Sequence, residues 1–136
     1  MQYWNVGCSV MCESISVSIK VTGPGVYCLG FDGGEGKTYL WEVLNSKSVL
    51  NEDILCVTYS KERVEDSLIK MIDDFSGQVL FLDRLNLYYT EKVGEALSKK
   101  NCVILVDLKD NDCLRHMPTA LAEVEIGEDK IEVREI

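Results

Sequence analysis

Short apolar runs alternate with amphipathic helical patterns along most of this chain. Four runs have the length and hydrophobicity of strands that are buried on both faces: Val26–Phe31, Ile54–Tyr59, Val79–Leu82 and Cys102–Val106. Between the runs, apolar residues recur at helical spacing, as Leu40, Val43 and Leu44 do after the first run. Strands that alternate with helices in this way indicate an α/β protein with a parallel sheet and helices on both of its faces.

The two ends of the chain instead show the alternation of apolar and polar residues that is typical of half-buried strands. The first such segment, Ile15–Val21, is followed by the turn Gly23–Gly25. The second, Ala122–Ile126, leads through a turn at residues 127–129 to Ile131–Val133. We therefore expect a three-layer sandwich with a mostly parallel sheet and antiparallel hairpins at its edges.

Composition points to one cytoplasmic domain. The chain has 136 residues and is 46% apolar, so we expect residues 1–136 to form a single domain with one core. No stretch approaches the ~20 apolar residues of a membrane span. Residues 1–12 contain no basic residue, so we expect no signal peptide and a cytoplasmic location.

Charge and cysteine usage narrow the choice of partners. The net charge of −9 argues against a nonspecific nucleic-acid groove, which needs clustered Lys and Arg. Three of the six cysteines, Cys28, Cys56 and Cys102, lie inside apolar runs, where a thiol behaves as a small hydrophobe. Because no CxxC pair occurs, we expect reduced thiols and no zinc site.

The strongest chemical signal is a glycine-rich loop between the first buried strand and a helix. The segment Asp32–Thr38 reads Asp-Gly-Gly-Glu-Gly-Lys-Thr. Glycines allow successive backbone N–H groups to point at phosphate oxygens, and the helix N-terminus adds partial positive charge. A lysine there can reach the β and γ phosphates, and a threonine hydroxyl can coordinate Mg²⁺. The expected nucleotide-binding residues are Gly33, Gly34, Glu35, Gly36, Lys37, Thr38 and Tyr39.

This segment resembles the Walker A element of P-loop NTPases, and Val79–Asp83 resembles their Walker B strand. The sequence departs from the Walker A pattern in having Phe31 where the first glycine belongs. Strand, loop and closing segments follow one another as in the cores of ABC and AAA-like ATPases, although no LSGGQ-like signature occurs. The chain is thus similar to a reduced P-loop NTPase domain of the additional-strand type. That resemblance implies the sheet order 5-1-4-3-2, with Thr38 and Asp83 holding Mg²⁺.

Hydrolysis is where the sequence differs from active relatives. Arg84 occupies the position at which many such ATPases carry a glutamate that activates water. The candidate catalytic residues are Lys37 and Asp107, which ends the fourth buried strand. Glu35, inside the loop, could also stand in for the missing glutamate, and the alternative for Asp107 is that it merely starts a loop.

The leading hypothesis is therefore binding of ATP or GTP with Mg²⁺ and weak NTPase activity, slow or dependent on a partner. The alternative is an interaction module that kept the fold but lost turnover and binds a protein partner or a second copy. A small-molecule kinase ranks third, because the chain has no Arg-rich lid segment.

Overall fold

A single mixed sheet runs through the part of the chain that the computed structural model describes, which is residues 2–6, 16–31, 35–48 and 52–136. The sheet has eight strands in the order β1-β2-β8-β7-β3-β6-β5-β4. The strands are β1 (Gln2–Val6), β2 (Ser16–Val21), β3 (Gly25–Phe31), β4 (Ile54–Val57), β5 (Val79–Leu82), β6 (Val103–Asp107), β7 (Thr119–Ile126) and β8 (Lys130–Glu135). The helices are α1 (Glu35–Ser48), α2 (Glu65–Asp74) and α3 (Glu91–Ser98), with the 3₁₀ segments η1 (Leu85–Leu87) and η2 (Leu108–Leu114).

The apolar runs form strands whose two faces are both covered. Strand β3 pairs in parallel with β6 on one side and β7 on the other, and β6, β5 and β4 continue in parallel. Alternate residues of β3 enter different cores: Tyr27 and Leu29 pack with α1, whereas Val26 and Cys28 pack with α2 and α3. This two-sided burial explains why β3 reads as a continuous apolar run.

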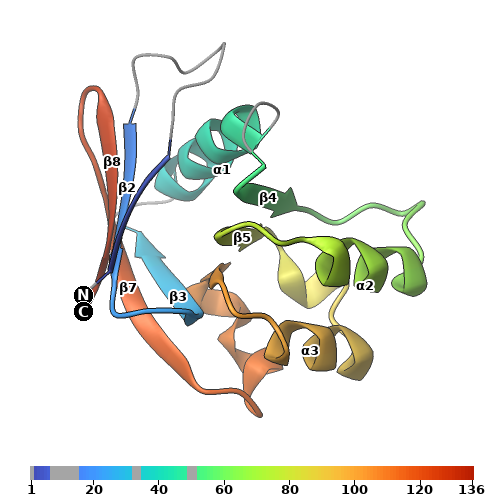
Figure 1. The fold of residues 1–136 in the computed structure, drawn as a ribbon. Coiled ribbons are helices and arrows are strands. Elements are labelled where there is room, and N and C mark those ends of the chain that lie inside the picture. The colour runs from blue at the N-terminus through green and yellow to red at the C-terminus, as the bar shows by residue number, and fades with distance from the viewer. Residues whose placement is uncertain (1, 7–15, 32–34, 49–51) are drawn as a thin grey trace.

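Helix α1 lies on one side of these strands, and α2 and α3 lie together on the other side (Figure 1). In α1 the fully buried residues are Leu40, Val43 and Leu44, the stripe expected from their helical spacing. Helix α3 begins at a capped residue, because the Thr90 side chain accepts a hydrogen bond from the backbone N–H of Val93. No helix in the described ranges combines the length and apolar character needed to cross a membrane.

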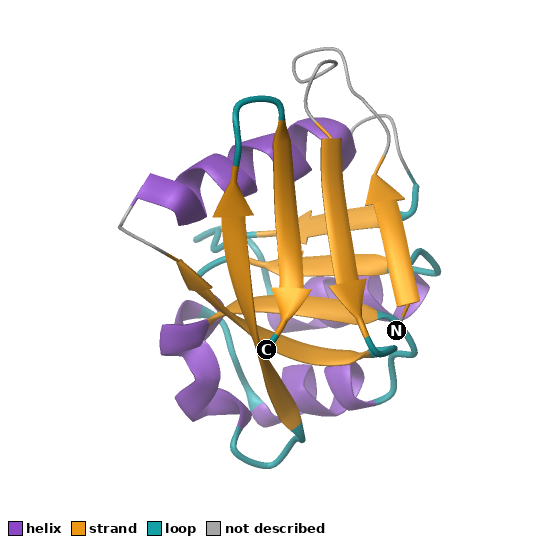
Figure 2. Cartoon of the chain, turned by 90° about the vertical axis from the view of Figure 1, so that its left-hand side faces the viewer, coloured by secondary structure: helices purple, strands orange, loops and turns teal. Residues whose placement is uncertain are grey.

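The sheet curls so that its other half covers α1. Strands β1 and β2 pair antiparallel, β7 and β8 pair antiparallel, and a parallel ladder between β2 and β8 joins the two pairs. Figure 2 shows these strands in front, running across the strands behind them, with α1 between. Val17 and Ile19 of β2 and Val133 of β8 belong to the same core cluster as Leu44. Helix α1 is therefore buried by both halves of one sheet.

The expectation of a three-layer sandwich with a mostly parallel sheet and edge hairpins is wrong. The order 5-1-4-3-2 does not describe this mixed, curled sheet of eight strands. The segment at residues 122–133 does form a hairpin, but β8 lies inside the sheet, between β7 and β2. The physical reason is that β2 and β8 bury their apolar faces on α1, which makes them part of the core.

The chain bends at residues 22–24, where a turn at residues 23–25 was expected, but β2 and β3 are not neighbours in the sheet. Gly25 has φ +154°, in the positive region that favours glycine. Its N–H donates to the carbonyl of Cys102 at 3.1 Å, so β3 joins β6 from its first residue. The Tyr27 hydroxyl donates to the carbonyl of Gly23 at 2.7 Å and holds the bend.

No disulfide joins the described cysteines Cys28, Cys56, Cys102 and Cys113, and Cys8 and Cys12 lie outside the described residues. Burial raises the pKa of both Cys28 and Cys102 above the usual value of a thiol. Since the thiolate is the reactive form, these two side chains serve as small core residues.

The burial of α1 by both halves of the sheet can be tested at Leu44, whose side chain is fully buried. We expect Leu44→Ala to lower the free energy of unfolding by about 2–5 kcal/mol, because it leaves a cavity between α1 and the sheet. Leu121→Ala is the matched control, since Leu121 is 51% exposed, and it should cost about 1 kcal/mol or less. Urea unfolding followed by circular dichroism measures both, and equal losses would contradict the curled architecture.

Candidate functional site

The expected phosphate loop connects β3 to α1 at the carboxyl edge of the parallel strands. Strand β3 ends at Phe31 and α1 begins at Glu35, so Gly36, Lys37 and Thr38 lie in the first turn of the helix. Gly33 and Gly34 lie outside the described residues. The Thr38 side chain is exposed, and Tyr39 is half-buried against the core around α1. The first turn of α1 therefore presents the unpaired backbone N–H groups of a helix N-terminus at this edge.

Three polar residues stand level at the carboxyl ends of β4, β5 and β6. Val57 pairs with Leu82, and Leu82 pairs with Val106, so the next residues along the three strands are Thr58, Asp83 and Asp107. Strand β6 lies between β3 and β5. At ~4.8 Å per strand, the end of β5 is about 10 Å from that of β3. Thr58 was not among the expected site residues, although it follows an apolar strand in the same way as Asp83 does.

The carboxylate of Asp83 is held by its neighbours on the β4 side. The Thr58 hydroxyl donates to Asp83 Oδ2 at 2.9 Å, and Arg84 Nε donates to the same oxygen at 3.2 Å. Arg84 Nη2 also donates to Thr58 Oγ1 at 3.0 Å, which closes a triangle of three side chains. Asp83 is 8% exposed, and its N–H donates to the carbonyl of Val57. The Arg84 side chain is 50% exposed, so solvent screens this ion pair in part.

These contacts bear on the expected role of Asp83 as a ligand of Mg²⁺. A magnesium ion takes carboxylate and water oxygens in nearly octahedral geometry, and at Oδ2 of Asp83 it would compete with two hydrogen bonds, one of them from a permanently charged guanidinium. Among the described residues, no group of three His, Cys, Asp or Glu side chains could hold a metal ion. Thr38, the other expected ligand, has no described contact that tests its role.

Two further carboxylates organise the segment beyond β6. Asp107 shares its face of β6 with Leu105, which packs with α1, and its Oδ1 accepts a hydrogen bond from the N–H of Lys109 at 3.0 Å. Asp110 is 1% exposed and accepts hydrogen bonds from the backbone N–H groups of Leu85 and Asn86. Asp107 thus faces the α1 side and also caps η2. Asp110 was not anticipated, because nothing in the sequence marks an acid in a loop as buried.

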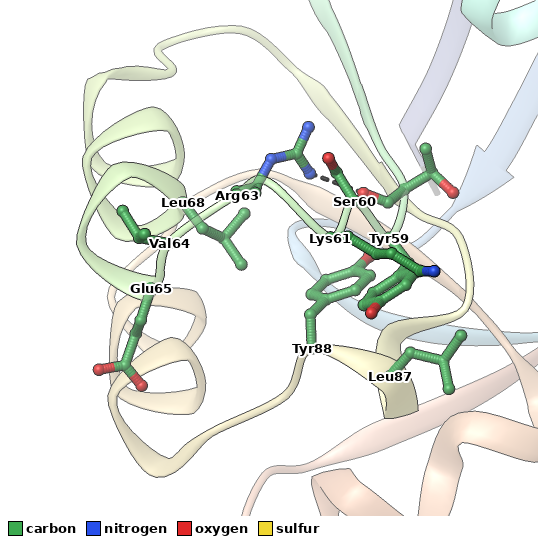
Figure 3. A pocket seen from close by; sticks show the side chains of 10 residues that line it. Tyr59, Ser60, Lys61, Arg63, Val64, Glu65, Leu68, Leu87 and Tyr88 are labelled. Atoms are coloured by element: carbon green, nitrogen blue, oxygen red, sulfur yellow. Dashed lines mark hydrogen bonds between the residues drawn. The ribbon is translucent and has the colours of Figure 1, made fainter.

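A pocket of about 230 Å³ opens beside the Asp83 triangle, at the end of β4. Figure 3 shows Tyr59, Leu87 and Tyr88 on one side of it and Arg63, Val64 and Leu68 on the other. Arg63 Nη1 donates to the carbonyl of Thr58 at 2.6 Å, and Tyr88 donates to the carbonyl of Val57 at 3.4 Å. Burial, with Asp83 and Asp110 nearby, raises the pKa of Tyr88 far above its usual value, so its hydroxyl stays a donor.

Comparison with known proteins adds little to this geometry. No model of a protein family matches the chain, and no curated protein matches it. Among solved structures, a chain described as "Model of ribosome-bound archaeal Pelota and ABCE1" is similar, with 14% sequence identity and a TM-score of 0.46. The match covers 100% of this chain and 34% of that one, so this chain spans about a third of its length. A likeness at this TM-score supports no inference about fold or function.

The role of Asp110 in holding the segment after Arg84 can be tested by substitution. We expect Asp110→Ala to lower the free energy of unfolding by about 1–3 kcal/mol, because the buried N–H of Leu85 loses its acceptor. Asp112→Ala, at an exposed acid two residues away, should change stability by about 0.5 kcal/mol or less. Thermal or urea unfolding measures both variants. Equal effects would mean that the Asp110 contacts do not stabilise this segment.

Proposed function

We propose that this chain binds the phosphates of ATP or GTP at the loop 32–34 and the first turn of α1. The observation that supports this proposal is the direct passage from β3, ending at Phe31, into α1, beginning at Glu35, at the carboxyl edge of parallel strands. Ligands of open α/β sheets bind at this edge. The first helical turn carries Gly36, Lys37 and Thr38, and its N–H groups favour an anion.

Local charge must outweigh the charge of the whole molecule for this proposal to hold. The chain carries a net charge of −9, which repels a nucleotide at long range. Screening at physiological salt limits that repulsion to roughly 8 Å, so the contacts at the loop decide affinity. The Lys37 ammonium and the dipole of α1, a helix of 14 residues, are the two positive elements expected there.

Turnover on this site is proposed to be slow. Arg84 directly follows Asp83, in the place of the expected glutamate, and an arginine cannot accept a proton from water. Asp107 is the carboxylate proposed to act as a base, since it ends the strand next to β3 on the face that looks toward α1. It also caps η2, so any movement toward a nucleotide requires that this hydrogen bond opens. A partner that remodels η2 would therefore raise the rate.

The pocket beside Asp83 favours a second candidate function, that of an interaction module. Three of its lining side chains, Tyr59, Val64 and Leu87, are large, apolar and exposed, by 38%, 64% and 53%. Such a cluster around one hollow suits docking of an apolar side chain from a protein partner. Wild-type protein that binds neither ATP nor GTP would favour this function over nucleotide binding.

Removing the charge of Lys37 tests the binding site. We expect Lys37→Ala to weaken ATP or GTP binding about tenfold to a hundredfold, the ~1.5–3 kcal/mol of a charge-assisted contact. Lys47→Ala is the matched control, because Lys47 lies in the last turn of the same helix, about 15 Å away at 1.5 Å per residue. Isothermal titration calorimetry reports both affinities. Equal affinity in Lys37→Ala and wild type would reject the loop.

A phosphate-release assay on the pure protein tests turnover. We expect a rate well below the usual enzyme range of ~1–10³ per second, because no side chain with the placement of the usual glutamate can take a proton. Asp107→Asn should lower the residual rate further while leaving nucleotide affinity unchanged. Fast turnover that is lost in Lys37→Ala but kept in Asp107→Asn would mean that another group is the base.

A further inference from the structure

Oδ2 of Asp83, the side chain expected to hold Mg²⁺, is paired with a positively charged side chain of the protein itself. Arg84 Nε lies 3.2 Å from Asp83 Oδ2, and the side chain of Asp83 is only 10% exposed. The same carboxylate oxygen accepts the Thr58 hydroxyl at 2.9 Å. A cation that approached this oxygen would have to displace both donors and stand beside a guanidinium that stays charged at physiological pH.

The backbone of Arg84 has an unusual conformation that neighbouring contacts stabilise. Arg84 has φ 53° and ψ 46°, a left-handed conformation, and it is the one non-glycine residue with positive φ in the described part of the chain. Such a conformation is unfavourable for a residue with a side chain and persists only where surrounding contacts hold it. Asp110 supplies that support, because it accepts the N–H groups of the next two residues, Leu85 and Asn86.

The three hydrogen-bonded side chains Thr58, Asp83 and Arg84 lie at the ends of β4 and β5. Thr58 follows β4, whereas the predicted phosphate loop follows β3, and these strands lie on opposite sides of β5. Arg84 donates to Thr58 as well as to Asp83, so these hydrogen bonds tie Oδ2 of Asp83 to the residue that follows β4.

We infer that nucleotide binds to this chain without a divalent cation held by Asp83, an inference that rests on the proposed nucleotide-binding function. The charge of the phosphates is then met by Lys37 and the N-terminus of α1, and Arg84 competes with metal for Oδ2 of Asp83. In this arrangement the guanidinium of Arg84, which belongs to the chain, provides the positive charge next to Asp83 that a bound Mg²⁺ would otherwise provide. The same arrangement is consistent with the slow turnover proposed above, since no metal is then positioned by Asp83.

The experiment compares nucleotide affinity in Mg²⁺ with affinity in EDTA, by calorimetry on the full chain. For the wild type we expect the two values to agree within about twofold, because a metal that gains no ligand from Asp83 adds little coupling to nucleotide binding. Arg84→Gly removes the guanidinium and suits the left-handed backbone, so the variant should fold. It should acquire a preference for Mg²⁺ of about tenfold or more, and the further change Asp83→Asn should abolish that preference.

Arg84→Lys serves as the control, because it keeps a positive charge beside Asp83 and should remain indifferent to Mg²⁺. A wild-type affinity that rises about tenfold or more with Mg²⁺ would overturn the inference, and this comparison needs no variant. An Arg84→Gly protein that stays indifferent to the metal would overturn it as well. Absence of binding in both buffers would instead reject the proposed nucleotide site, and the inference with it.

Discussion

Burial of α1 between the two halves of one curled sheet is the constraint on which the rest of the structure depends. Leu40, Val43 and Leu44 share a core with residues of β2 and β8 on one side and of β3 and β5 on the other. A helix enclosed in this way cannot tilt or slide without opening a cavity, because protein interiors are close-packed. The first turn of α1 is therefore held at the carboxyl edge of β3, and the geometry of the candidate phosphate site follows from packing some distance away.

The opposite face of the same strands carries the second core, which positions the polar residues at the strand ends. Val57, Leu82 and Val106 all pack with α2 and α3, so the residues that follow them emerge at one level. Thr58 and Asp83 are thereby close enough to hydrogen-bond, and Asp107 stands at the end of the adjoining strand. The polar row is a consequence of strand register rather than of any local motif.

Arg84 occupies the position after Asp83 at which a glutamate was expected, and its side chain contacts the polar residues at the strand ends. A residue at that position could have faced a nucleotide, but its side chain instead closes on Asp83 and Thr58. The left-handed backbone, the buried Asp110 beneath it and the adjacent pocket form one contiguous region at the ends of β4 and β5. Binding of phosphate at β3 and recognition of a partner at β4 would thus occur at two places along one sheet edge.

The sequence by itself determined most of the elements and the junction between β3 and α1, although it did not predict β1. Hydrophobic periodicity is a local property, so the apolar runs and the stripe of α1 could be read directly. Only the tertiary structure decided that β2 pairs with β8 instead of β3, because the alternation of Ile15–Val21 shows that one face is buried but not what covers it.

The contacts around Asp83 likewise could not be predicted. Thr58, which donates to Asp83, lies 25 residues earlier in the chain. Asp110, which accepts from the backbone of Leu85, lies 25 residues after Leu85. Contacts between segments so far apart depend on strand order and register, which no local pattern encodes.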